Sequence, residues 1–128
     1  MISAARIDAL FSSTANQLSD YDNLSSRALG RGIDRYLAKD YSGAVKEFRL
    51  SIALSPSSEY AAKSYEYMAT AYLSQNNTAE AMNTYKEYLK QNPFSAQTRL
   101  NLGNLYFRNS QFKEAEQEYA MAVRIDPV

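Results

Sequence analysis

The chain has 128 residues, with 14 basic and 14 acidic side chains, 11 tyrosines and no His, Cys or Trp. Without thiol and imidazole groups it lacks the parts of disulfides, Cys/His metal sites, Ser-His-Asp triads and Cys-His dyads. We therefore expect no metal, no cofactor and no enzymatic activity. The zero net charge provides no general attraction to nucleic acid or to an anionic membrane, and we expect neither as a partner.

The N-terminal segment, residues 1–24, carries no targeting pattern. Arg6 and Asp8 interrupt its apolar run, and nowhere in the chain do 18 apolar residues follow one another. We therefore expect a cytoplasmic protein without a spanning helix.

The same segment is expected to form a capping helix. Ile7, Leu10, Phe11 and Leu18 are spaced as one helical face, and the polar residues at 20–23 predict a stop before the next element. A disordered leader is the alternative, favoured by the Ser, Thr and Asn residues at 12–16.

From residue 25 onward one pattern recurs three times. It reads A-x3-[F/Y]-x7-P, and its fixed positions are Ala44, Phe48 and Pro56; Ala81, Tyr85 and Pro93; and Ala115, Tyr119 and Pro127. A small residue stands twelve positions before each Ala, at Gly32, Ala69 and Gly103. The copies are offset by 37 and then 34 positions, so residues 59–61 are an insertion. The sequence thus predicts repeats at 25–58, 62–95 and 96–128.

Each repeat predicts a pair of antiparallel helices. In the third repeat, apolar and small residues between 102 and 107 share one helical face, and those between 115 and 123 share another. Only a short polar turn at 108–111 separates them, so the two helices run antiparallel. Gly103 and Ala115 are expected where the backbones cross, and Pro127 ends the second helix. In the middle repeat, Asn77 and Glu80 predict a capping box.

The first repeat departs from this pattern in its first helix. Arg27, Arg31 and Arg35 form a basic stripe there. Either the helix is rotated by about one residue, or its outer face is polar because no full repeat precedes it. Because acidic residues lie nearby, we interpret the stripe as a solvated, partly paired face and not as a phosphate-binding site.

These residues resemble the tetratricopeptide repeat family, whose period is 34 residues. In the third repeat, seven of the eight signature positions match: Leu102, Gly103, Tyr106, Ala115, Tyr119, Ala122 and Pro127. Arg99 stands in place of the usual Trp. The resemblance implies an all-α fold, a right-handed superhelical solenoid of antiparallel helix pairs, with three repeats and the N-terminal capping helix.

The resemblance also implies a concave groove that binds a partner and is lined by the first helix of each repeat. The matching positions here are Leu29, Ile33, Tyr36 and Leu37; Lys63, Glu66, Thr70 and Leu73; and Gln97, Leu100, Asn104, Phe107 and Arg108. Such a wall is apolar and aromatic with scattered polar groups, which suits a helix or an extended peptide. Ile33 and Tyr36 are equally compatible with core positions of a rotated first helix.

The sequence therefore predicts a non-enzymatic module that binds a protein or peptide partner in the groove. The alternative is a scaffold that self-associates into a homo-oligomer through its repeat ends. At the C-terminal end, Tyr119, Met121, Val123 and Ile125 are expected to be partly uncovered. Two explanations of such an uncovered end are open: the chain belongs to a longer array, or this end pairs with another copy or a partner.

Overall fold

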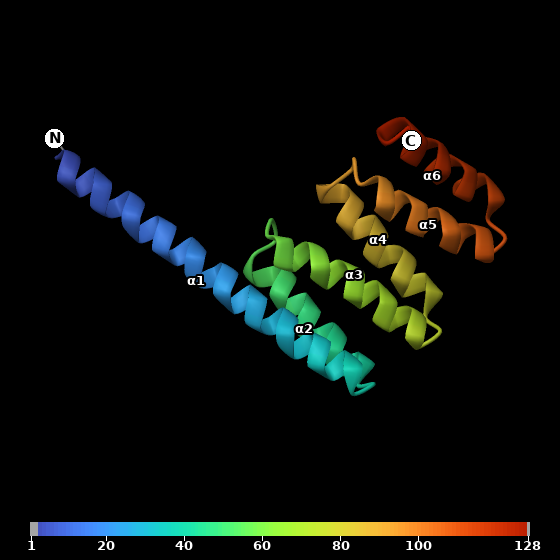
Figure 1. The fold of residues 1–128 in the computed structure, drawn as a ribbon, viewed down its shortest axis with the longest axis horizontal. Coiled ribbons are helices and arrows are strands. Elements are labelled where there is room, and N and C mark those ends of the chain that lie inside the picture. Colours follow the sequence, from blue (N-terminus) through green and yellow to red (C-terminus); the bar gives the residue numbers. More distant parts are fainter. Residues whose placement is uncertain (1–2, 128) are drawn as a thin grey trace. The chain divides into compact units, whose positions relative to one another are not determined.

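The computed structural model describes residues 3–127, and at position 15 only the backbone. These residues form six α-helices and no strand, which confirms the all-α fold (Figure 1). The helices are α1 (Ala4–Leu37), α2 (Tyr41–Leu54), α3 (Glu59–Ser74), α4 (Thr78–Gln91), α5 (Ala96–Arg108) and α6 (Phe112–Ile125). The chain divides into two compact units, Met1–Ser64 and Tyr65–Val128. Positions 1, 2 and 128 of the predicted domain ranges lie outside the described residues.

The turns inside the helix pairs share one geometry. Lys39, Asn76 and Ser110 have left-handed backbones, with φ of 62°, 58° and 60°. The residue that follows each of them donates its backbone N–H to a carbonyl five residues earlier, over 2.8 Å in every turn. Along the sequence these three turns are offset by 37 and 34 residues. The offsets equal those of the sequence pattern, so the period that predicted the repeats is present in the backbone.

Side-chain caps fix where most of the helices begin. Asp40, Asn77 and Ser95 each accept a hydrogen bond from the backbone N–H three residues later. The Asn77 cap agrees with the start predicted from the sequence. The residues at 59–61 belong to α3, which has 16 residues where α5 has 13. The extra residues thus lengthen a helix and do not form a loop.

In the first unit, α1 and α2 pack closely because the contact residues are small. Gly32 of α1 is buried, and a Cβ at this position would overlap the ring of Phe48. Ser25 Oγ donates to the carbonyl of Ser51 over 2.7 Å, and Ser51 Oγ donates to the carbonyl of Ser25 over 2.9 Å. Both serines are fully buried, so this reciprocal pair satisfies its own polar atoms inside the interface. Ser55 also donates to the Asp22 carboxylate, where α2 ends.

The predicted stop at 20–23 is wrong. Helix α1 runs through these residues without interruption from Ala4 to Leu37, and its N-terminal half extends beyond the end of α2 (Figure 1). No Gly or Pro occurs between positions 3 and 29, so the backbone has no reason to leave the helix. The residues expected to fold as a separate capping helix are the start of a 34-residue helix, and the apolar side chains of their face are exposed.

The second unit has one apolar core that α4, α5 and α6 share with the end of α3. Its members are Ala69, Ala81, Met82, Tyr85, Leu89, Leu102, Leu105, Tyr106 and Ala115. Gly103 lies against the Tyr119 ring, since a Cβ there would be 2.8 Å from Tyr119 Cε1. The small residue of the pattern therefore makes room for an aromatic ring, as Gly32 does in the first unit.

Arg99, at the place of the usual Trp, joins α5 to two other elements. Its Nη1 lies 3.0 Å from Glu118 of α6. Its Nε and Nη2 donate to the carbonyl of Pro93 over 3.1 and 2.9 Å. The Arg99 side chain is only 15% exposed and its pair with Glu118 is partly buried, while its bonds to Pro93 lie at the surface. At this position an ion pair and two hydrogen bonds hold α5 against its neighbours, where the resembled family has an apolar ring.

Candidate functional site

The predicted wall residues of α1 divide between core and surface. Leu29 is buried, with 7% of its surface exposed, so it belongs to the core of the first unit and is not accessible to a partner. Ile33 and Tyr36 are half-buried, and the Tyr36 ring packs edge-on against Tyr41, with centroids 5.5 Å apart. Leu37 is largely exposed. Half of this stripe therefore fits the core alternative that the sequence left open.

Two of the three arginines in the basic stripe of α1 pair with acidic residues. Arg31 Nε lies 3.0 Å from Glu47 Oε2, and Arg35 Nη1 lies 2.9 Å from Asp40 Oδ2. A hydrogen bond from the Gly43 backbone and then the Arg35 guanidinium lower the pKa of Asp40 below its usual value. These pairs agree with the interpretation of a solvated, partly paired face.

Helix α3 contributes polar wall positions. Lys63 is exposed in the first unit, while Glu66 and Thr70 are exposed in the second. Thr70 Oγ1 donates to the carbonyl of Glu66 over 3.0 Å, so its hydroxyl is bonded within the helix. Leu73 packs against the core of the second unit. Burial and the charge of Glu66 raise the pKa of Tyr85, which belongs to that core.

Helix α5 presents the most accessible part of the predicted wall. Leu100, Asn104 and Phe107 follow one another at helical spacing, and all three are exposed. Phe107 has 57% and Leu100 has 38% of its surface in solvent. Gln97 and Arg108 extend this face at its two ends, and Gln97 donates to Asn101 over 3.0 Å. We call Leu100, Asn104 and Phe107 the α5 face.

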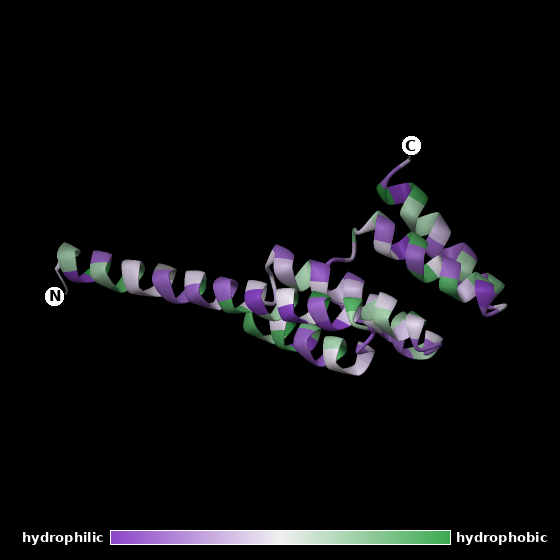
Figure 2. Cartoon of the chain, turned by 60° about the horizontal axis from the view of Figure 1, so that its bottom comes forward, coloured by the Kyte–Doolittle hydropathy of each residue, from purple (hydrophilic) through white to green (hydrophobic). Residues whose placement is uncertain are grey.

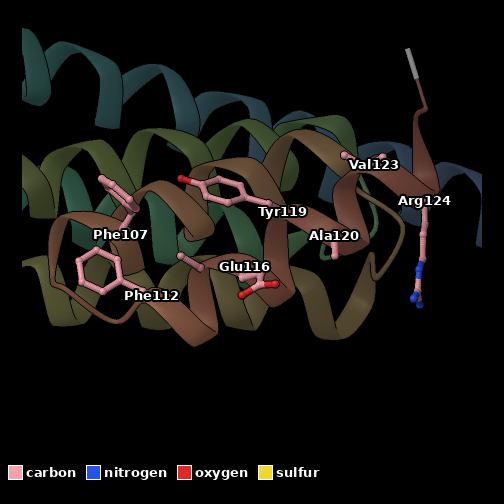
Figure 3. Close-up of a pocket in the computed structure, with 8 residues that line it drawn as sticks. Phe107, Phe112, Glu116, Tyr119, Ala120, Val123 and Arg124 are labelled. Carbon is pink, nitrogen blue, oxygen red and sulfur yellow. The ribbon is translucent and has the colours of Figure 1, made fainter.

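An apolar groove of about 590 Å³ lies beside the α5 face, along α6. Its lining consists of Phe107, Phe112, Ala115, Glu116, Tyr119, Ala120, Val123 and Arg124. Figure 3 shows the two phenylalanines at one end and Val123 with Arg124 at the other. The rings of Phe107 and Phe112 pack edge-on with centroids 5.3 Å apart. We call this hollow the α6 groove.

The sequence anticipated part of this groove and missed part of it. Tyr119 and Val123 were expected to be uncovered at the end of the array, and Val123 is 60% exposed. Phe112 was not singled out, although it is an exposed aromatic residue directly after a turn. Tyr119 connects the two surfaces, because its hydroxyl donates to Asn104 of the α5 face over 2.6 Å.

The described residues offer few groups for metal binding or membrane insertion. Residues 3–127 contain no group of three acidic, His or Cys side chains placed to hold a metal ion. Among the helices described, none is long and apolar enough to cross a bilayer. The exposed features that stand out in the second unit are thus the α5 face and the α6 groove.

Comparison with known proteins finds similarity to one family of repeat proteins. A family model described as "Tetratricopeptide repeat" matches residues 68–128. Two relatives named "Photosystem I assembly protein Ycf3", from Prochlorococcus marinus strains NATL1A and NATL2A, are each 28% identical over 102 residues. The matched region covers 69% of this chain and 59% of each relative, so the chain spans about three-fifths of their length.

Solved structures share the fold at lower identity. "MamA RS-1 ArsTM double mutant" matches with a TM-score of 0.67 and 15% identity, covering 93% of this chain and 69% of that one. "Crystal structure of MamA" matches with a TM-score of 0.65 and 14% identity, covering 99% and 77%. The repeat family indicated by the sequence is confirmed over residues 68–128, which the tetratricopeptide repeat model matches.

Proposed function

We propose that this chain is a non-enzymatic interaction module that binds an apolar segment of a partner protein on the α5 face. The observation that carries the proposal is the exposure of Leu100 and Phe107, two large apolar side chains about two helical turns apart on the same helix. A helix or extended peptide with apolar anchors matches such a surface. Asn104, between them, offers a hydrogen-bonding group that would fix how the bound segment is aligned along α5.

The fixed position of this face supports the proposal. Leu102, Leu105 and Tyr106 lie on the opposite side of α5 and are buried in the core, so the helix cannot rotate. A partner therefore orders few groups of this protein when it binds, which lowers the entropic cost. The relatives' name, an assembly protein, is in keeping with a module that holds other proteins.

The test is capture from an extract of the source cell with purified wild-type chain, followed by titration of the captured partner. We expect the double variant Leu100→Ser/Phe107→Ser to lose at least about tenfold in affinity, because two anchors are removed. The matched control is Leu50→Ser/Phe94→Ser, which makes the same chemical change at two exposed residues elsewhere. Equal losses in both variants would contradict the proposal, as would capture that neither variant changes. Circular dichroism checks that both remain folded.

Self-association through the α6 groove is the second candidate. The groove is almost entirely apolar and Val123 lies open on it, which favours burial against another protein surface. Under this function Val123→Asp lowers the sedimentation coefficient of an oligomer, while Leu100→Ser, a change outside the groove lining, leaves that coefficient unchanged. A wild-type chain that sediments as a monomer at all concentrations would exclude it.

A further inference from the structure

The exposed N-terminal half of α1 carries an apolar seam that continues the contact with α2. Ile7, Phe11, Thr14, Leu18 and Tyr21 alternate in steps of four and three residues. The same alternation leads on to Ser25, Ala28 and Gly32, which are buried in the first unit. A spacing of 3.5 residues is typical of helices that pack along their length against another helix. We call residues Ile7, Phe11, Thr14, Leu18 and Tyr21 the α1 seam.

The seam is uncovered over its whole length. Ile7, Phe11, Leu18 and Tyr21, with Leu10 and Leu24 beside them, are between 42% and 70% exposed. Figure 2 shows hydrophobic residues recurring among hydrophilic ones up to the N-terminal end of this helix. Thr14 in the middle donates its hydroxyl to the carbonyl of Leu10 over 3.0 Å. Its polar group is thus satisfied within α1, and the seam is ready for burial.

We propose that two copies of this chain form a symmetric dimer in which their α1 seams pack antiparallel. In the register that we propose, Phe11 faces Thr14 of the other copy and Ile7 faces Leu18. Tyr21 then faces Ala4. Each large residue meets a smaller or matching one, as helix packing at uniform distance requires.

Length favours this register, and charge does not oppose it. Arg6 comes level with Ser19 of the other copy and Asp8 with Gln17, so no like charges face each other along the seam. The partner helix would end opposite Tyr21, one residue short of Asp22, where Ser55 marks the end of α2. The second copy therefore uses the free length of α1, about 27 Å, without overlapping α2.

The buried area is sufficient for a stable pair. Five large side chains on each copy, Ile7, Leu10, Phe11, Leu18 and Tyr21, offer on the order of 100 Å² each, since an aromatic residue buries 150–250 Å² in full. Two such surfaces would bury roughly 1,000 Å², which reaches the smallest area expected of a biological interface. The contact is also continuous with the α1–α2 interface, so the same side of α1 packs along its full length.

The first test is sedimentation equilibrium of the full chain from about 5 to 200 µM. We expect the wild type to reach twice the monomer mass of 14.4 kDa. Phe11→Asp/Leu18→Asp should weaken the dimer by more than about 100-fold, because four unpaired carboxylates would be buried. The matched control is Ala9→Asp/Asn16→Asp, with the same charges at the same spacing on the opposite face. Both variants alter exposed residues, and circular dichroism verifies the helix content.

The second test determines the register from disulfide crosslinks between introduced cysteines. The chain contains no Cys of its own, so no other disulfide can form. Ile7→Cys and Leu18→Cys should crosslink to each other when the two variants are mixed and oxidised, and neither should crosslink to itself. Self-crosslinking of either variant alone indicates a parallel pair and overturns the register. A monomeric wild type, equal loss in the seam variant and its control, or dissociation by Val123→Asp alone would overturn the α1 dimer.

Discussion

Two glycines on α1, only two positions apart, should respond to the same substitution with opposite signs. At Gly30 a Cβ has no neighbouring heavy atom within 4 Å. At Gly32 a Cβ would overlap the Phe48 ring, with Cδ1 2.6 Å and Cζ 3.1 Å away. Phe48 is fully buried, so its ring cannot swing into solvent to make room. Comparing alanine substitutions at Gly30 and Gly32 therefore separates the effect of helix propensity from the effect of packing within one helix.

The magnitudes follow from these surroundings. Gly30→Ala should raise the free energy of unfolding by about 0.5–1 kcal/mol, because Ala loses less backbone entropy in a helix. Gly32→Ala has the same favourable effect on the free energy of unfolding, but overpacking against the Phe48 ring lowers that free energy by about 1–3 kcal/mol. We therefore expect a net loss of roughly 0.5–2 kcal/mol for this variant.

The assay is urea unfolding followed by circular dichroism at equal protein concentration. With an m-value of about 1.5 kcal/mol/M, Gly30→Ala should move the midpoint up by roughly 0.3–0.7 M. Gly32→Ala should move it down, and Phe48→Leu should relieve part of that loss in the double variant. If Gly32→Ala stabilised the protein as much as Gly30→Ala does, the close α1–α2 contact would be refuted.

Three further predictions concern polar contacts. Arg99→Lys should destabilise the second unit by about 1–3 kcal/mol in urea unfolding, because an ammonium group cannot reproduce the two hydrogen bonds that the guanidinium donates to the Pro93 carbonyl. The control is Arg108→Lys in the same helix, which should change the midpoint little because Arg108 is exposed. Ser25→Ala should cost about 1–2 kcal/mol in the same assay, by removing a buried hydrogen bond. The folded-state pKa of Asp40 is lowered, so its stabilising effect is present above the ordinary carboxyl pKa and is lost as pH falls through the folded value. Asp40→Asn should remove that part of the acid dependence, measured as urea midpoints from about pH 2 to 6.

The helix pairs were predictable because their signals are local. A turn that needs a left-handed residue recurs at fixed offsets, and a small residue twelve positions before each Ala admits a ring from the facing helix. Gly32 and Gly103 are required by Phe48 and Tyr119, which stand at the aromatic position of the pattern. Periodicity alone therefore identified the residues that meet in the α1–α2 and α5–α6 pairs, although not which of them contact each other.

The candidate site was less predictable, since exposure depends on packing between elements. Leu29 and Leu73 stand at positions expected on the wall, yet one is buried in the first unit and the other packs on the core of the second. Phe107 stands at an equivalent position and is exposed. Spacing gives the face of a helix, but the side chains of its neighbours decide how much of that face a partner can reach.

The N-terminal half of α1 shows why a polar cluster does not by itself end a helix. Asp20, Asp22 and Asn23 avoid the α1 seam, which passes through Leu18, Tyr21 and Ser25. These polar residues occupy the solvated sides of a helix that continues, and ending it would require a residue that leaves helical geometry. Because the seam drifts by only about 20° in seven residues, its exposed and buried halves face nearly the same side. A partner for Phe11 and Leu18 must therefore approach α1 from the side that α2 already covers further along the helix, and an antiparallel copy that ends opposite Tyr21 meets this condition.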